Sequence, residues 1–252
     1  MIAQSAFADG GLRSHRAGPA GALGCYFGHV PDAAARFDAV LFDLDGVLVD
    51  SEPRWNDVRI AYAGARGLAW THDDQRACMG GNSRQWAEIM RERLGLADEP
   101  VERIEADVIE GLVDAYRHGG VEVIAGAPEA VSRIAARWQV AIASSSPPRV
   151  IAAAVDALGL HGVFGALTSS DEVPRGKPEP DVYLLAARRL GVAPHRCIVV
   201  EDSVNGVLAG KAAGAYAVLI PNPSVLPPAE AFDAADAVVA SLADLRPDAL
   251  PA

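Results

Sequence analysis

The chain has 252 residues, of which 50% are hydrophobic and 22% are charged. These values are typical of a globular protein that buries a real core, so bulk disorder is excluded. The formal net charge is −11 at pH 7, and general nucleic-acid binding is not expected because an acidic surface repels phosphate backbones. No stretch of the sequence supplies the roughly 18–20 consecutive apolar residues that a membrane-spanning helix requires.

Three cysteines, Cys25, Cys78 and Cys197, lie far apart and form no CxxC motif. Their odd number and spacing argue against a disulfide framework or a zinc knuckle and fit a reducing compartment. We therefore expect a cytoplasmic protein, monomeric by default, with no membrane or nucleic-acid partner.

The first 36 residues differ from the rest of the chain. They are rich in glycine and alanine and show no sustained hydrophobic period. They also lack the basic start and continuous apolar run of a signal peptide. Residues 1–36 are predicted to be a poorly ordered extension.

From residue 37 onward, short apolar runs alternate with helical patterns. The runs are typical of strands buried on both faces, and they cover residues 39–43, 140–144, 163–168, 197–201, 216–220 and 236–240. Apolar spacing predicts helices over 128–138, 179–190 and 203–213, the last with Ser203 as N-cap and Gly214 just beyond its end. The alternation predicts an α/β fold with a parallel sheet covered on both faces.

One long segment interrupts this alternation. Residues 51–118 contain amphipathic helical patterns and no strand signal. They are predicted to form an all-helical insertion after the first strand. The α/β core would then comprise residues 37–50 and 119–252.

Polar residues gather at the predicted carboxyl ends of the strands. In open parallel sheets the ligand crevice lies at that edge, so side chains from distant parts of the chain would meet there. These candidates are Asp43, Asp45, Ser144, Glu201 and Asp202, joined by Lys177 in the loop GKPEPD.

The four acidic candidates have few nearby cations. Packed together without compensation they would repel one another, and a hard divalent cation such as Mg²⁺ relieves this repulsion. Lys177 is one of only two lysines, the other being Lys211, in a chain that otherwise uses arginine. A lysine at this place suits a phosphate oxygen, because its ammonium is a compact point charge.

The segment FDLDGVLVDSE, residues 42–52, resembles the first signature of the haloacid dehalogenase superfamily. The other signatures follow in order: Ser144 at a strand end, Lys177 before Pro178, and EDSVNGVLAGKAAG over 201–214. The resemblance covers roughly residues 38–245 and is closest to the branch of sugar-phosphate phosphatases and β-phosphoglucomutase. It implies a Rossmann-like, doubly wound core with a helical cap domain.

The resemblance also implies roles for the acidic residues. Asp43 would be the nucleophile that forms an aspartyl-phosphate, and Asp45 the general acid and then base. Mg²⁺ would be held by Asp43, Asp202 and the backbone carbonyl of Asp45, with Glu201 helping directly or through water. Two of these acids also have a structural role as the alternative to metal binding. Asp202 could merely cap the following helix, and Glu201 could be purely structural.

The remaining candidates would bind the substrate, a small phosphorylated molecule. Ser144 and Lys177 would hold the phosphoryl group. Arg84, in the loop GGNSRQW, resembles a cap arginine of the sugar-phosphate branch and would contact the leaving group or a second anion. Ser144 could instead be a turn hydroxyl, and Arg84 a solvated helix charge.

The leading functional prediction is a Mg²⁺-dependent phosphatase for a small phosphorylated metabolite. A β-phosphoglucomutase-like mutase is the first alternative, although Trp55 stands where the mutase resemblance has a histidine. A dehalogenase would have no use for Asp45, and phosphonate cleavage would need a cap lysine that residues 51–118 lack. A phospho-accepting switch domain without turnover is the alternative from another class.

Overall fold

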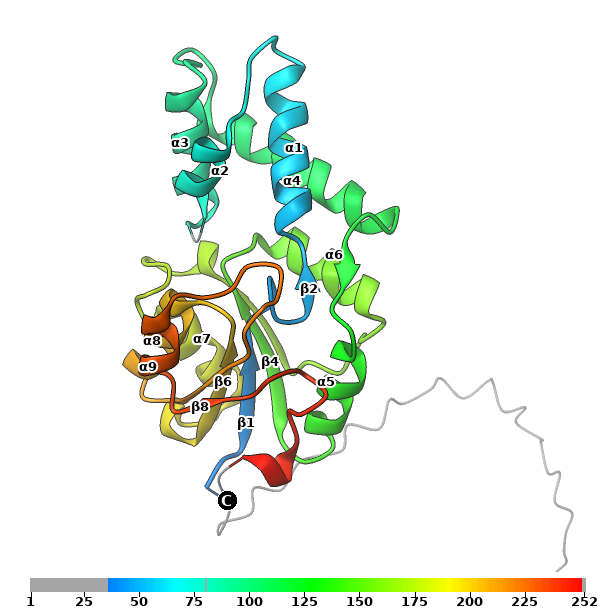
Figure 1. Cartoon of the computed structure of the whole chain (residues 1–252), viewed down its shortest axis with the longest axis vertical. Helices are drawn as coiled ribbons and strands as arrows, with labels where there is room; N and C mark the ends of the chain where they lie inside the picture. The colour runs from blue at the N-terminus through cyan, green and yellow to red at the C-terminus, as the bar shows by residue number, and fades with distance from the viewer. Residues whose placement is uncertain (1–35, 80, 251–252) are drawn as a thin grey trace, which may run out of the picture. The chain divides into compact units, whose positions relative to one another are not determined.

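The computed structural model describes residues 36–79 and 81–250, so residues 1–35 of the predicted extension lie outside its described part. A six-stranded sheet in the order β5-β4-β1-β6-β7-β8 forms the centre of the fold, and every pairing in it is parallel (Figure 1). The strands are β1 (Ala39–Phe42), β4 (Gln139–Ser144), β5 (Ala166–Ser169), β6 (Cys197–Glu201), β7 (Tyr216–Leu219) and β8 (Ala237–Val238).

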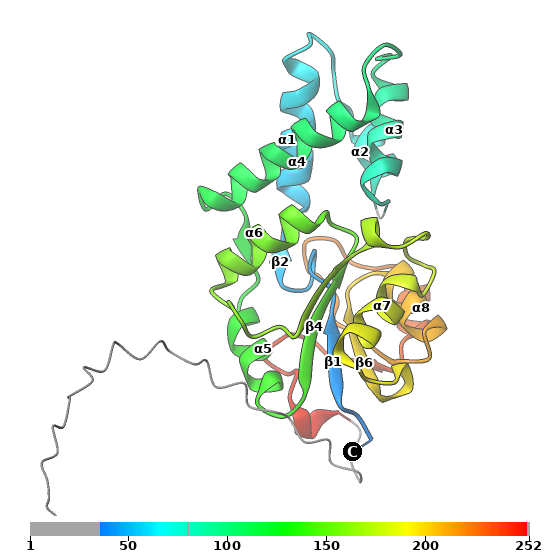
Figure 2. The same cartoon turned by 180° about the vertical axis from the view of Figure 1, so that it is seen from behind.

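Helices cover both faces of this sheet, as Figures 1 and 2 show from opposite sides. They are α5 (Ala127–Ala135), α6 (Pro148–Leu158), α7 (Asp181–Leu190), α8 (Val204–Ala212) and α9 (Ala229–Ala234), with short 3₁₀ turns η1 (Ser170–Glu172), η2 (Pro194–Arg196) and η3 (Pro247–Ala249). Alternate residues of β1 enter different cores: Val40 and Phe42 join one buried cluster, Ala39 and Leu41 another. The predicted doubly covered α/β fold is confirmed.

The strand order places three carboxyl ends side by side. β1 lies between β4 and β6, with Phe42 opposite both Ile142 and Val200. The residues that follow or end these strands, Asp43, Ser144 and Glu201, therefore meet at one edge of the sheet.

Helices α1 (Glu52–Gly64), α2 (His72–Cys78), α3 (Ser83–Arg93) and α4 (Val101–Arg117) form the segment between β2 and β3. Its two ends are joined by an antiparallel ribbon of β2 (Val49–Asp50) and β3 (Glu122–Val123). The sequence did not predict this ribbon, because strands of two residues carry no detectable period. Over residues 36–79 and 81–250, no helix combines the length and hydropathy needed to cross a membrane.

The local signals around α8 are also confirmed. The Ser203 hydroxyl accepts a hydrogen bond from the Gly206 amide and so caps the helix. Gly214 has a φ of 83°, the left-handed conformation that ends helices at little cost in glycine.

Candidate active site

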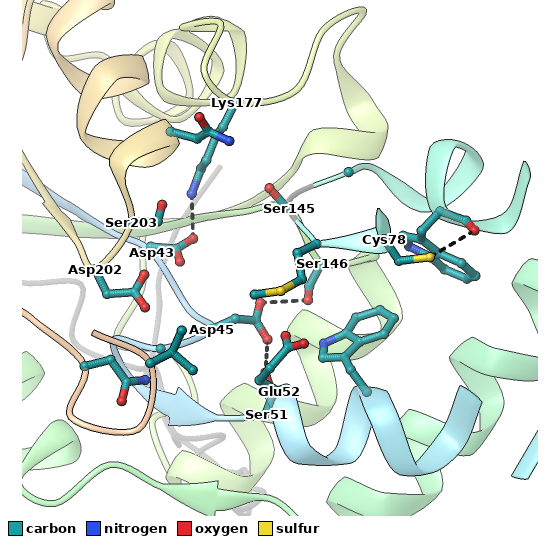
Figure 3. Close-up of a pocket in the computed structure, with 18 of the residues that line it drawn as sticks. Asp43, Asp45, Ser51, Glu52, Cys78, Ser145, Ser146, Lys177, Asp202 and Ser203 are labelled. Atoms are coloured by element: carbon teal, nitrogen blue, oxygen red, sulfur yellow. Dashed lines mark hydrogen bonds and ion pairs between the residues drawn. The ribbon is translucent and has the colours of Figure 1, made fainter. Parts of the chain in front are cut away.

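A cavity of about 290 Å³ lies between the carboxyl edge of the sheet and the helical segment. Its core side includes residues that follow β1, β4, β6 and β7 and Lys177 from the loop before α7, and its other side includes residues of α1, α2 and α3 (Figure 3). Chemically reactive side chains that line it include Asp43, Asp45, Lys177 and Asp202 from the core, and Glu52, Arg59 and Cys78 from the helices.

Lys177 joins two acids that are distant in the sequence. Its Nζ lies 2.6 Å from Oδ1 of Asp43 and 2.6 Å from Oε1 of Glu201, and its side chain is only 6% exposed. Burial lowers the pKa of Lys177, but the charges of Asp43 and Glu201 outweigh that effect and leave the pKa well above its usual range. Lys177 is therefore a permanently charged anchor in the cavity.

Glu201 is fully buried, and both of its oxygens are engaged. Besides Lys177, the Tyr183 hydroxyl donates to Oε1 at 2.7 Å. Oε2 accepts from the amides of Asp202 and Ser203, at 3.1 Å each, and from the Ser203 hydroxyl at 3.0 Å. Burial raises the pKa of Glu201, yet Lys177 and these donors outweigh it and hold the pKa below its usual value, so Glu201 is ionised.

Three carboxylates, those of Asp43, Glu201 and Asp202, each place an oxygen within 4.8 Å of the others. Burial, opposed by Lys177, raises the pKa of Asp43 to about 8. Burial and the charges of Glu201 and Asp43 raise the pKa of Asp202 well above its usual range. Within the described ranges no lysine or arginine forms an ion pair with Asp202.

This donor set fits a divalent cation. It consists of hard oxygen atoms, its ionised form carries more negative charge than Lys177 neutralises, and two of its members, Asp43 and Asp202, line the cavity. The backbone beside it is also specialised: Gly46 has a φ of 85°, and a Cβ at this position would lie 2.0 Å from Oδ2 of Asp202. Only glycine allows Asp202 to pack this closely against the turn after β1.

Hydroxyl groups hold Asp45 in place. The Ser51 hydroxyl donates to Oδ1, and the hydroxyls of Ser144 and Ser146 donate to Oδ2 at 3.1 Å and 2.8 Å. The Ser144 hydroxyl also accepts from the Ser146 amide at 2.9 Å, and Ser144 is fully buried. Ser144 and Ser146 both bind Asp45, but Ser146 also lines the cavity, as Ser145 does, whereas Ser144 does not (Figure 3).

Arg84 does not join the other predicted site residues. Its side chain is 62% exposed, is absent from the cavity lining, and pairs with Glu88 and Glu102 at 3.0 Å each. The reason is the orientation of α3, which buries Ser83 and Trp86 and leaves Arg84 facing outward.

A different arginine lines the cavity. Arg59 on α1 is 3% exposed, and its guanidinium lies 4.7 Å from the ring centroid of Trp55 and 5.5 Å from that of Trp86. The two indoles contact each other edge to face, 5.7 Å apart. Arg59 was missed, although a signal exists: it occupies the buried face of α1 with Trp55, Tyr62 and Ala63, at helical spacing.

Comparison with known proteins agrees with the signatures. Residues 37–214 match the family model of haloacid dehalogenase-like hydrolases. A phosphorylated carbohydrates phosphatase of Thermotoga maritima is 34% identical over 178 residues, which are 70% of this chain and 82% of that protein. Hexitol phosphatase B of Escherichia coli K12 is 31% identical over 226 residues, 82% of this chain and 93% of that protein.

Solved structures show the same fold. CbbY from Rhodobacter sphaeroides, in complex with phosphate, superposes with a TM-score of 0.73 at 26% identity, covering 83% of this chain and 96% of that one. A putative β-phosphoglucomutase from Thermotoga maritima has a TM-score of 0.65 at 31% identity, covering 83% of this chain and 97% of that one. The match over residues 37–214 covers most of the chain and contains every signature, so this chain is an enzyme of the haloacid dehalogenase-like hydrolase family.

Proposed function

We propose that this enzyme is a Mg²⁺-dependent phosphatase that hydrolyses a small phosphorylated metabolite, a sugar phosphate or a similar phosphomonoester, through an aspartyl-phosphate on Asp43. One observation carries the proposal: Asp43, Asp45, Asp202 and Lys177 line a single cavity. Its volume of about 290 Å³ lies at the lower end of the range for ligand pockets, which favours a small substrate. The relatives named as carbohydrate and hexitol phosphatases support the same substrate class.

The reaction follows from the two aspartates. An oxygen of Asp43 attacks phosphorus, and the bond from phosphorus to the leaving oxygen breaks while Asp45 donates a proton to that oxygen. Asp45 then takes a proton from a water molecule, whose oxygen attacks phosphorus and releases Asp43 and inorganic phosphate. The hydrogen bonds from Ser51, Ser144 and Ser146 hold the Asp45 carboxylate in a fixed orientation for both proton transfers.

The cation would be held by Asp43, Asp202 and the backbone carbonyl of Asp45. When bound, it supplies positive charge that offsets the repulsion between the phosphate and the carboxylates. Glu201 accepts hydrogen bonds at both oxygens, so we assign it to holding Lys177 and the 202–203 amides rather than to direct metal contact. Lys177 would bind a phosphoryl oxygen, and Ser144 would act mainly by orienting Asp45.

Hydrolysis is favoured over the mutase alternative. Trp55, 7% exposed and packed against Trp86, occupies the position at which the mutase resemblance has a histidine. No histidine is found among the described residues that line the cavity. The cavity therefore lacks the imidazole that the mutase resemblance would supply. The switch-domain alternative gives no role to a cavity whose second side is formed by three additional helices, α1, α2 and α3.

The test is a phosphate-release screen over sugar phosphates, phosphoglycolate and nucleotides, with Mg²⁺ and with a chelator. We expect Mg²⁺-dependent turnover of sugar phosphates that Asp43→Asn abolishes. Glucose 6-phosphate forming faster than inorganic phosphate from β-glucose 1-phosphate, with a bisphosphate activator present, would establish the mutase instead. A phosphoryl group that stays on the protein for hours without turnover would establish the switch.

We also propose a cytoplasmic location and a monomeric state for this enzyme. Cys78 and Cys197 are buried free thiols, which suits the cytoplasm. A monomeric enzyme whose partners are small molecules, with no nucleic acid or membrane involved, stays a prediction from composition. Size-exclusion chromatography with light scattering tests the monomer directly.

A further inference from the structure

Arg59 is a buried cation on α1. No hydrogen bond or ion pair joins its guanidinium to any residue in the described part of the chain, and its Nε is fully buried and unpaired. A guanidinium carries five N–H donors, and buried donors left unpaired are destabilising. Arg59 therefore has hydrogen-bonding capacity that no described residue uses.

The aromatic neighbours of Arg59 fix its position. Trp55 and Trp86 contact each other and both lie within 5.5 Å of the guanidinium. Contacts of this kind hold a cation at its place but use none of its N–H groups. The guanidinium therefore lies in the cavity wall, and its two Nη groups, which form no hydrogen bond with the described residues, are the donors that a ligand in the cavity can reach.

The charges around the cavity indicate which ligand group Arg59 can accept. Glu52, on the same helix and in the same wall, offers a carboxylate whose Oε1 accepts from Nε2 of Gln75 at 2.7 Å. Arg59 and Glu52 together carry no net charge, and Asp50 adds a further negative charge to the lining. A second phosphate or a carboxylate on the substrate would meet one cation and two acids, so an uncharged group with several hydroxyls is favoured.

We propose that Arg59 is the specificity-determining residue of this enzyme: its guanidinium donates hydrogen bonds to hydroxyl oxygens of an uncharged polyhydroxyl leaving group, while Asp43 attacks the phosphate at the other end of the cavity. This inference rests on the proposed phosphatase function and deepens it. Arg84, the arginine that the sequence singled out, is then outside this recognition because it is paired at the surface.

The experiment compares Arg59→Met, which removes every donor at similar length, with the wild type. Arg59→Lys keeps the charge but not the planar donor set. Arg103→Met is the matched control, since Arg103 lies on α4, is 66% exposed and does not line the cavity. The substrates are glucose 6-phosphate and ribose 5-phosphate, with neutral leaving groups; phosphoglycolate and fructose 1,6-bisphosphate, with anionic ones; and acetyl phosphate, which has no hydroxyl group. Thermal melting confirms that each variant is folded.

We expect Arg59→Met to raise KM for the better neutral sugar phosphate by about 10-fold or more. The kcat/KM of Arg59→Met for acetyl phosphate should change by less than about 2-fold. The KM of Arg59→Lys for the neutral sugar phosphate should lie between the values of the wild type and Arg59→Met. Arg103→Met should match the wild type on every substrate. An equal loss on acetyl phosphate, a larger loss on the anionic substrates, or no change in KM would each overturn the proposal.

The phosphatase function is tested separately from the role of Arg59. Wild-type protein that releases no phosphate from any ester contradicts the phosphatase, whatever Arg59 does. Calorimetric titration of glucose 6-phosphate into Asp43→Asn and into Asp43→Asn/Arg59→Met gives the comparison without turnover. At least 10-fold weaker binding in the double variant supports the role of Arg59, and equal binding refutes it.

Discussion

Tyr183→Phe removes one oxygen atom from the buried network behind the cavity. Tyr183 is fully buried on α7, and its hydroxyl donates to Oε1 of Glu201 at 2.7 Å. Phenylalanine keeps the ring and its packing, so the change isolates this hydrogen bond. Lys177 still donates to the same oxygen at 2.6 Å, and Glu201 therefore keeps a charged partner.

The expected magnitude follows from the charge of Glu201. A hydrogen bond to an ionised group contributes about 1.5–3 kcal/mol to the free energy of unfolding. For a chain of this size each 1 kcal/mol corresponds to roughly 2–4 °C in Tm. Tyr183→Phe should therefore lower Tm by about 3–12 °C. Its effect on kcat should be smaller than that of Lys177→Met, because Lys177 retains both of its carboxylate partners.

Thermal and urea unfolding measure the stability change, and phosphate release measures kcat. Tyr216→Phe is the matched control: the Tyr216 hydroxyl lies 3.2 Å from the Asp236 carbonyl near the surface, and its loss should shift Tm by less than about 2 °C. Equal Tm values for Tyr183→Phe and the wild type would show that the network behind Glu201 does not stabilise the fold as described.

Three further outcomes are expected. Gly206→Ala would place a Cβ 1.7 Å from Oε1 of Glu201. This clash should lower the free energy of unfolding by about 3 kcal/mol or more. A Tm equal to that of the wild type would show that the Glu201 carboxylate can move aside. Asp171→Ala removes the acceptor of the Ser83 amide, 2.8 Å away, and of the Ser83 hydroxyl. We expect KM to rise about 3–10-fold because this contact between α3 and the core is lost. An unchanged KM would show that the contact does not contribute to substrate binding. Burial raises the pKa of Asp43 to about 8, so in metal-free protein its contribution to stability is present in acid and lost as pH rises toward 8. Because Mg²⁺ binds the ionised carboxylate, the gain in Tm on adding Mg²⁺ should be larger at pH 8 than at pH 5.5, and a gain independent of pH would contradict this linkage.

Much of the site could be predicted from the sequence because its residues directly follow or end buried strands. Asp43 comes after β1, and Glu201 ends β6, so the predicted parallel sheet already brings them to one edge. Lys177 lies in a loop without a strand signal, and its place in the cavity was predicted from the resemblance and from the rarity of lysine in this chain, which has only two.

The remaining features depend on three-dimensional packing. The direction of the Ser144 hydroxyl, toward Asp45, is set by a rotamer that no sequence pattern encodes. The partner of Tyr183 lies on another element, 18 residues away, and the helical period predicts only that Tyr183 is buried. Arg59 and Arg84 both lie on helices of the segment between β2 and β3, and their opposite exposure depends on how α1 and α3 face the core.

Acid quenching followed by peptide mass spectrometry shows whether Asp43 becomes phosphorylated during turnover. The enzyme is mixed with its best substrate and Mg²⁺, quenched within milliseconds, and treated with borohydride to convert a phosphorylated aspartate into a stable product. We expect this product to form at residue 43 and to disappear when the substrate is exhausted or Mg²⁺ is chelated. Full turnover without modification of residue 43, or with modification at another acid, would show that Asp43 is not the nucleophile.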